Sequence, residues 1–169
     1  LFNLETTSDV MAPATVTGLS WIVEGTAFRG TWAGPTTNQD STPLRDFKDF
    51  QVRVFSPADT GVSATYYTAA ARFDFPFESN LNSLGVPRAE VTIEVKARDN
   101  TGNLSIVATA TSSNPAPANV TGFTATGISD AISLKWNANS DDDLKYYRVY
   151  QGTSFGAENT LVYTGLATN

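Results

Sequence analysis

The sequence contains no cysteine and no histidine among its 169 residues. Without cysteine the chain can form neither disulfides nor thiolate metal sites, so its stability must come from apolar burial and backbone hydrogen bonding. Without histidine it lacks the most common general base and the most common metal ligand. No pair of carboxylates stands at a spacing that identifies it for acid–base chemistry. We therefore expect no catalytic residues, no metal site and no cofactor, and a function other than that of an enzyme.

Basic clusters and long apolar runs are also missing. The chain has 11 Lys and Arg against 17 Asp and Glu, a formal net charge of −6, and no basic cluster is available to neutralise phosphates. No apolar run approaches the roughly 18 residues that cross a bilayer as a helix. We therefore expect neither nucleic-acid binding nor membrane insertion. What is present is an apolar fraction of 41%, with ten Phe, six Tyr and three Trp, which is enough to build a packed core.

An internal repeat divides the chain into units. The segment from Met11 to Ser20 recurs from Pro115 to Thr124, 104 positions later, and the same shift places Trp32 on Trp136. A repeat of this length has the size of a small domain. The second copy reaches only about half of that length, so we expect it to continue beyond residue 169. The predicted boundaries are 1–11 for the end of a preceding segment, 12–111 for a complete first domain, 112–117 for a linker with Ser and Pro, and 118–169 for the N-terminal part of a second domain.

Apolar and polar residues alternate along most of the chain, which places alternate side chains on one face of a strand. In the clearest case, 91–97, every second residue is apolar and the residues between them are charged or Thr. About seven short strands separated by turn residues predict a two-sheet antiparallel sandwich. Its predicted core residues are Phe28, Trp32, Phe50, Val52, Val91, Ile93 and Val95 in the first unit, and Ile132, Leu134, Trp136 and Val149 in the second.

Two neighbouring segments carry further structural expectations. Residues 66–72 are rich in Ala and allow a turn or two of helix, although no stretch of the chain combines a helical period with capping residues. Phe73, Phe75 and Phe77 alternate with Asp74 and Pro76, a pattern that predicts one strand with an aromatic inner face.

Candidate interaction residues come from a loop and from one tryptophan. Relative to the second unit, the first carries seven extra residues within 33–45, and surface loops are where insertions survive and where binding is usually placed. Asn38, Gln39 and Asp40 are the polar candidates in this loop. Trp21 has no aromatic counterpart in the second unit, where Ala125 stands, so it is a candidate for contact with a neighbour. The acidic run 141–143 fits no known calcium loop and is typical of a solvated turn.

These patterns resemble the fibronectin type III domain. The resemblance is carried by the opening Val16-Thr17-Gly18-Leu19, the tryptophan at position 32, the strand with Phe50-Gln51-Val52, and the closing 91–105 with its Asp-Asn-Thr-Gly-Asn turn. It covers about residues 12–114 as a whole domain and 116–169 as the first half of another. It implies an all-β, immunoglobulin-like antiparallel sandwich, with one complete domain and a partial second copy.

A narrower resemblance concerns the modules of tail tip attachment proteins, the host specificity proteins of lambda-like siphophages. It is carried by 73–81, by the segment Gly85-Val86-Pro87-Arg88, and by 95–105. It implies a virion location in the phage tail tip or a tail fibre, and a homotrimeric central hub in the parent protein. It also implies that other tail proteins are binding partners, and that a bacterial surface receptor is a further binding partner.

Two other readings stay open at the level of the sequence. The alternative to the phage tail reading is a spacer or carbohydrate-binding accessory module of a secreted bacterial polysaccharide-degrading enzyme, in which the catalytic domain lies elsewhere. The chain is also compatible with a segment of a cell-surface adhesion protein. Both alternatives place the chain outside the cell.

Overall fold

The computed structural model describes residues 11–141, 144–153 and 158–168. Contacts divide the chain between Pro115 and Ala116 into two compact units, here called unit 1 and unit 2. The predicted end of a preceding segment, 1–11, lies outside the described residues except for Met11. The predicted linker, 112–117, begins too early. The last strand of unit 1 extends to Ser113 and so includes the first two residues of that linker.

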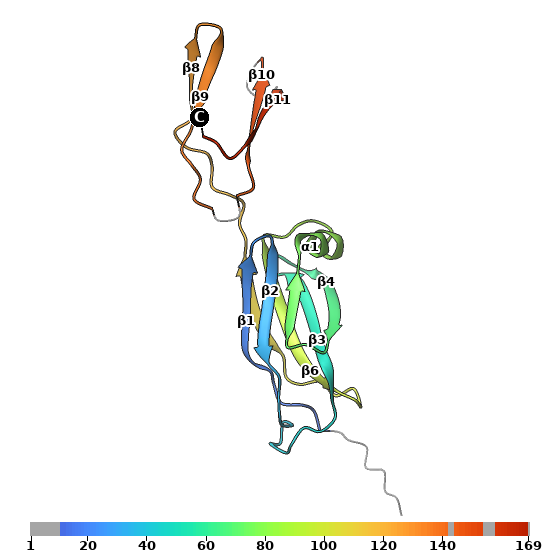
Figure 1. Cartoon of the computed structure of the whole chain (residues 1–169). Helices are drawn as coiled ribbons and strands as arrows, with labels where there is room; N and C mark the ends of the chain where they lie inside the picture. The colour runs from blue at the N-terminus through green and yellow to red at the C-terminus, as the bar shows by residue number, and fades with distance from the viewer. Residues whose placement is uncertain (1–10, 142–143, 154–157, 169) are drawn as a thin grey trace, which may run out of the picture. The chain divides into compact units, whose positions relative to one another are not determined.

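Unit 1 is a sandwich of two antiparallel sheets (Figure 1). The first sheet has the order β1-β2-β5, and the second has the order β4-β3-β6-β7. A short helix, α1, follows β5 at one end of the sandwich. This division into a three-stranded and a four-stranded sheet defines an immunoglobulin-like sandwich of the fibronectin type III type. The elements are β1 (Thr17–Glu24), β2 (Ala27–Ala33), β3 (Phe47–Ser56), β4 (Asp59–Thr68), β5 (Arg72–Phe75), α1 (Phe77–Leu84), β6 (Glu90–Asp99) and β7 (Ala108–Ser113).

The core of unit 1 lies between the two sheets and is centred on β6. Val91, Ile93, Val95 and Ala97 are all 0% exposed, as the alternation in the sequence indicates for the inner face of a strand between two others. In the register, β6 lies opposite β3, with Val52 paired to Val95. The remaining predicted core residues of this unit are buried as well, namely Phe28, Trp32 and Phe50.

Trp21 belongs to this core and not to the surface. It is 5% exposed, its ring stacks on Phe28 at 5.6 Å between centroids, and its Nε1 donates a hydrogen bond to the Val91 carbonyl at 3.0 Å. Its cross-strand partner is Gly30, where a Cβ would lie 3.1 Å from the indole ring. The missing side chain of Gly30 therefore leaves the space that Trp21 occupies. The prediction of Trp21 as an interaction residue was wrong.

In unit 2 the large and the small residue of this cross-strand pair have exchanged places. The repeat places Trp21 on Ala125 and Gly30 on Leu134, and Ala125 and Leu134 are likewise cross-strand partners. Each unit thus places one small and one large residue at this cross-strand pair.

The expected aromatic strand 73–77 is shorter than predicted, and a helix begins at its last residue. β5 ends at Phe75, which is 0% exposed, and Pro76 stands at the N-cap of α1, so Phe77 begins the helix with an exposed ring. Asn80 holds the segment after α1 in place, because its side chain accepts from the Arg88 amide at 2.9 Å and donates to the Arg88 carbonyl at 2.8 Å. Residues 66–68 continue β4, so the helical turn allowed for 66–72 does not form.

Unit 2 consists of two antiparallel hairpins. They are β8 (Thr124–Ile128) with β9 (Ala131–Lys135), and β10 (Tyr147–Gly152) with β11 (Glu158–Gly165). Trp136 is buried and its ring lies 5.5 Å from that of Tyr147. The other predicted core residues of this unit are less covered: Ile132 is 68% exposed, and Leu134 and Val149 are half-buried. Ile132 is not buried, because no strand of the described residues covers this face.

Candidate interaction surfaces

The extra loop of unit 1, 33–45, is an ordered hairpin-like loop. Thr37 bridges to Pro43, and the Asn38 amide donates to the Thr42 carbonyl at 2.8 Å. The loop is attached to the segment that precedes β1, because the Gln39 amide donates to the Ala12 carbonyl at 2.9 Å. Backbone bonds at its base and its tip thus hold the loop in one conformation.

The three polar candidates lie together at the tip of this loop. Gln39 and Asp40 are exposed and Asn38 is half-buried. The Asp40 carboxylate accepts hydrogen bonds from the Thr42 hydroxyl at 2.6 Å and from the Thr42 amide at 3.0 Å, and these bonds lower the pKa of Asp40 below its ordinary value. The tip therefore presents a fixed negative charge and an amide side chain to solvent, a suitable arrangement for polar contacts with a partner.

The outer face of the four-stranded sheet is a second polar surface. Arg98 pairs with Asp49 through two hydrogen bonds of 2.8 and 2.6 Å, and its guanidinium lies 4.3 Å above the ring of Tyr67. Gln51 donates to the Tyr67 hydroxyl at 3.2 Å. The Tyr67 side chain is 53% exposed. Neighbouring side chains on β3, β4 and β6 are thus linked to one another, which stiffens this face of the sheet.

We expect Asp49→Asn to weaken unit 1 only slightly, because the pair with Arg98 lies on the outer face of a sheet whose core is unchanged. The urea midpoint should fall by a small amount, and 1 M NaCl should reduce the difference from wild type, since salt screens such pairs. Glu24→Gln, which removes one of the two carboxylate partners of Arg29 at a more exposed position and leaves Asp74 in place, should give no measurable change. Loss of the folded state in Asp49→Asn would show that this pair has a larger structural role.

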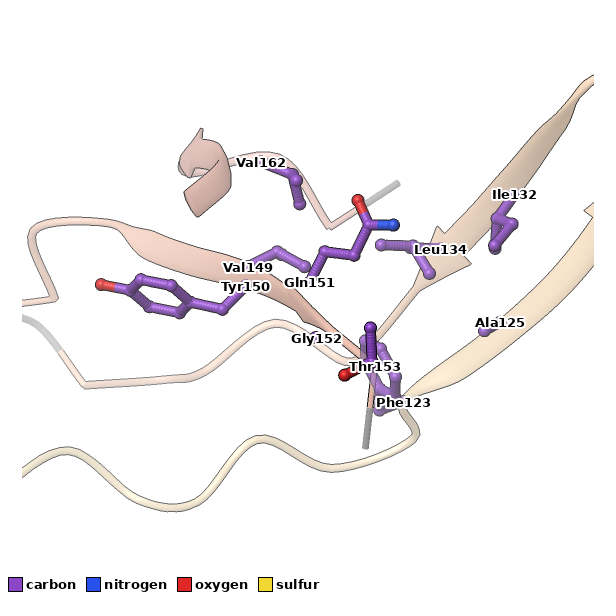
Figure 2. A pocket seen from close by; sticks show the side chains of 10 residues that line it. All are labelled: Phe123, Ala125, Ile132, Leu134, Val149, Tyr150, Gln151, Gly152, Thr153 and Val162. Carbon is purple, nitrogen blue, oxygen red and sulfur yellow. The ribbon is translucent and has the colours of Figure 1, made fainter. Parts of the chain in front are cut away.

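Unit 2 presents an apolar groove between its two hairpins, with a volume of about 680 Å³. Figure 2 shows the side chains that line it, with Ile132 and Leu134 on β9 and with Val149 and Gln151 on β10. The remaining lining residues are Phe123, Ala125, Tyr150, Gly152, Thr153 and Val162.

No group of three carboxylates that could hold a metal ion occurs in the part of the chain that the structure describes. Of the acidic run 141–143, only Asp141 is described, and its carboxylate accepts a hydrogen bond from the Ala118 amide at 2.9 Å. Asp142 and Asp143 lie outside the described residues. Within the described ranges, no helix is long and apolar enough to cross a membrane.

Comparison with known proteins adds structural similarities at low sequence identity. No protein-family model matches the chain, and no curated protein matches it. A crystal structure of an Fn3-like protein from Clostridium thermocellum is 23% identical, with 64% of this chain and 99% of that chain covered and a TM-score of 0.40. The FN1–FN3 domains of chicken CNTN1 are 14% identical, with 94% and 57% covered and a TM-score of 0.45.

A third similar structure is the spore cortex lytic enzyme SleM of Clostridium perfringens, at 22% identity and a TM-score of 0.43. The match covers 62% of this chain and 29% of that enzyme. The chain thus spans less than a third of the length of this protein. The class of the fold, an antiparallel sandwich of the fibronectin type III type, follows from the strand order of unit 1.

Sequence reasoning missed the polar partners of Tyr67. The alternation in 91–97 indicated that Glu94 and Lys96 face water, and the same phase extends to Arg98. The pairing of Arg98 with Asp49 and Tyr67 depends on the register of three strands, which a pattern within one strand does not contain.

Proposed function

We propose that the chain is a non-enzymatic structural and interaction segment of a phage tail tip (central hub) or tail fibre protein that takes part in host attachment. The observation that carries the proposal is the repetition of one sandwich design along the chain, with the same opening segment and the same core tryptophan in both units. Such a repeat is suited to spacing and presentation, because each unit contributes length and outward loops without a shared active site.

The structure supports this role in two ways. The core of unit 1 and its linked outer sheet face resist bending of the sheets. The loop at 33–45 is held in one conformation by backbone hydrogen bonds, so a partner that binds its tip pays little ordering entropy. In the proposed setting the partners are other tail proteins and further copies of the parent chain in a homotrimer, and a bacterial surface receptor is an additional one.

Localisation on the virion tests this proposal. Antibodies raised against the folded chain should label the tail tip or a tail fibre in negative-stain electron micrographs of virions from the genome that encodes it. They should also slow adsorption to host cells, since they would cover an attachment structure. The reading frame on both sides should encode β-rich tail protein beside other virion genes. A signal peptide with a hydrolase domain in the same frame would reject the phage assignment.

The exposed ring of Tyr67 favours a second candidate function. An aromatic ring among polar side chains is a platform on which a sugar can stack, as in an accessory module of a secreted polysaccharide-degrading enzyme. In that case the chain should be retained on insoluble polysaccharide, and Tyr67→Ala should abolish retention while Tyr150→Ala, which removes an exposed ring from unit 2, should not. Under the phage assignment we expect no retention of wild type.

A further inference from the structure

Two neighbouring rows of side chains cross the outer face of the four-stranded sheet of unit 1. Each row takes one residue from β4, one from β3 and one from β6. In the register, one row is Thr65, Arg53 and Glu94, and the next is Tyr67, Gln51 and Lys96. Five of these six residues line a small hollow of about 60 Å³, and Tyr67 completes the second row. An exposed aromatic ring and a polar hollow are therefore neighbours on this face.

The ring of Tyr67 is held in one orientation. Gln51 donates to its hydroxyl at 3.2 Å, and the Arg98 guanidinium lies 4.3 Å from the ring centroid on one side. Asp49 holds Arg98 in turn through two hydrogen bonds. The Tyr67 side chain is still 53% exposed, so the ring face away from Arg98 is accessible. A ring that is already fixed costs little ordering entropy when a ligand stacks on it.

Lys96 supplies the charge of the site. The two arginines of this face are each paired with a carboxylate, Arg53 with Glu94 at 3.1 Å and Arg98 with Asp49 at 2.6 Å. Within the described part of the chain, no carboxylate lies at ion-pair distance from Lys96. Lys96 and the tyrosine of its row lie two strands apart, a backbone spacing of about 9–10 Å. The flexible four-carbon stem of a lysine spans part of that distance.

We propose that these two rows bind a hexuronate unit of an acidic polysaccharide. The sugar ring stacks on the open face of Tyr67, and its carboxylate pairs with Lys96 through a charge-assisted hydrogen bond. The sugar hydroxyls bond to the polar side chains of the hollow. The inference rests on the proposed role in host attachment and adds to it the chemical class of the surface receptor.

The hollow favours a sugar over an acidic peptide. It offers acceptors in the Glu94 carboxylate and the Gln51 side-chain carbonyl, and donors in Arg53 and Lys96. A hydroxyl both donates and accepts, so the hydroxyls of a sugar can bond to either kind of group. The carboxylates of an acidic peptide only accept, and the charge of Glu94 would repel them. One carboxylate per unit, directed at Lys96, suits these charges.

Titration of the isotope-labelled full chain with hexagalacturonate, followed by NMR, tests the site. The amide signals of Tyr67, Gln51 and Lys96 should shift and reach saturation. The methyl ester of the same oligosaccharide keeps the rings but carries no charge. It should bind more weakly by about tenfold or more, since a hydrogen bond to a charged group contributes more than one between neutral groups. Hexaglutamate, which keeps the carboxylates without the rings, should bind more weakly by a similar factor.

Matched variants separate the charge from the ring. Lys96→Gln should weaken hexagalacturonate binding by about tenfold or more and leave binding of the methyl ester unchanged. Lys135→Gln makes the same change at an exposed lysine of unit 2 and should bind like wild type. Tyr67→Ala should weaken binding of both oligosaccharides, whereas Tyr67→Phe, which keeps the ring, should retain it. None of these side chains belongs to the core, so circular dichroism should show all four variants folded.

Several results would overturn the proposal. Equal binding of hexagalacturonate and its methyl ester would do so, and so would equal weakening by Lys96→Gln and Lys135→Gln or the absence of any shift in the three amide signals. Tighter binding of hexaglutamate would assign the face to an acidic peptide instead. A labelled virion tail without oligosaccharide binding would reject this inference alone. Oligosaccharide binding without virion labelling would reject the role in host attachment and keep the site.

Discussion

Trp21→Ala is expected to lower the free energy of unfolding of unit 1 by about 3–5 kcal/mol, the range for truncation of a buried large aromatic residue. The substitution removes the stack on Phe28 and the hydrogen bond to the Val91 carbonyl, and leaves a cavity beside Gly30. Urea unfolding of the full chain, followed by circular dichroism, measures the change.

The volume exchange between the units predicts a partial rescue. Gly30→Leu alone should destabilise unit 1 by about 1–3 kcal/mol or more, because its side chain overlaps the indole of Trp21. The double variant Trp21→Ala/Gly30→Leu reproduces the pair Ala125 and Leu134 of unit 2. It should be more stable than the sum of the single changes by about 1–3 kcal/mol, the coupling expected for residues in contact.

A second buried tryptophan provides the control for the double-mutant cycle of Trp21 and Gly30. Trp32 is also buried and packs edge-on against Phe50 at 5.2 Å, so Trp32→Ala should cost a similar 3–5 kcal/mol. Gly30→Leu should not rescue it, because the cavity opens at a different place in the core. Additive effects in the cycle with Trp21 would contradict the explanation of the exchanged volumes. A folded Trp32→Ala variant that had lost only binding would make that tryptophan a site.

Asp99→Ala is expected to cost about 3 kcal/mol, because it removes the acceptor around which the turn after β6 is built. Asp99 is 0% exposed. One carboxylate oxygen accepts from the Thr101 amide and hydroxyl, both at 2.9 Å, and from the Asn103 amide at 2.8 Å. The other accepts from the Asn103 side-chain amide at 2.8 Å. Thermal unfolding of the variant and of wild type measures the loss.

The same carboxylate predicts a dependence of stability on pH. Burial alone raises the pKa of Asp99, but the hydrogen bonds from Asn103 and Thr101 outweigh burial and hold the pKa below the ordinary value of 3.8. A pKa that is lower in the folded state contributes stability that is fully present above the unfolded value and is lost as the pH falls through the folded value. Wild type should therefore lose stability below about pH 4.

Asp99→Asn separates the charge from the shape of this turn. The variant keeps one acceptor oxygen but directs an amide at the side-chain amide of Asn103, so it should be less stable than wild type at pH 7. Its stability should also fall less steeply than that of wild type as the pH drops below 4. A parallel pH dependence in the two proteins would assign the acid sensitivity to other carboxylates.

Much of unit 1 was predictable, for a physical reason that particular strands illustrate. The alternation from Val91 to Ala97 indicated a buried inner face, and the structure shows these apolar residues fully covered. The turn at 99–103 was also predictable, because Asp, Asn and Gly favour turns through side-chain hydrogen bonds and positive φ; Gly102 has φ 96°. Each of these two signals depends only on residues that lie close together in the sequence.

Other features depended on contacts between distant segments. Phe77 continues the phase of Phe73 and Phe75, yet it begins α1, because Pro76 has no N–H for a continued strand ladder. Trp21 is buried because its partner across the sheet is Gly30, and Tyr67 gains Arg98 as a neighbour through the register of three strands. A single-strand pattern contains none of these pairings.

The sequence by itself determined the all-β class, the repeated unit and the phase of the strands that alternate clearly, such as 91–97, because alternation with period two is a local property of the chain. The tertiary structure decided which side chains of one phase are covered. Ile132 and Phe28 occupy the same place in the repeat, and Phe28 is buried while Ile132 is exposed. The physical reason is that phase places a side chain on one face of a sheet, whereas its burial requires a second layer over that face.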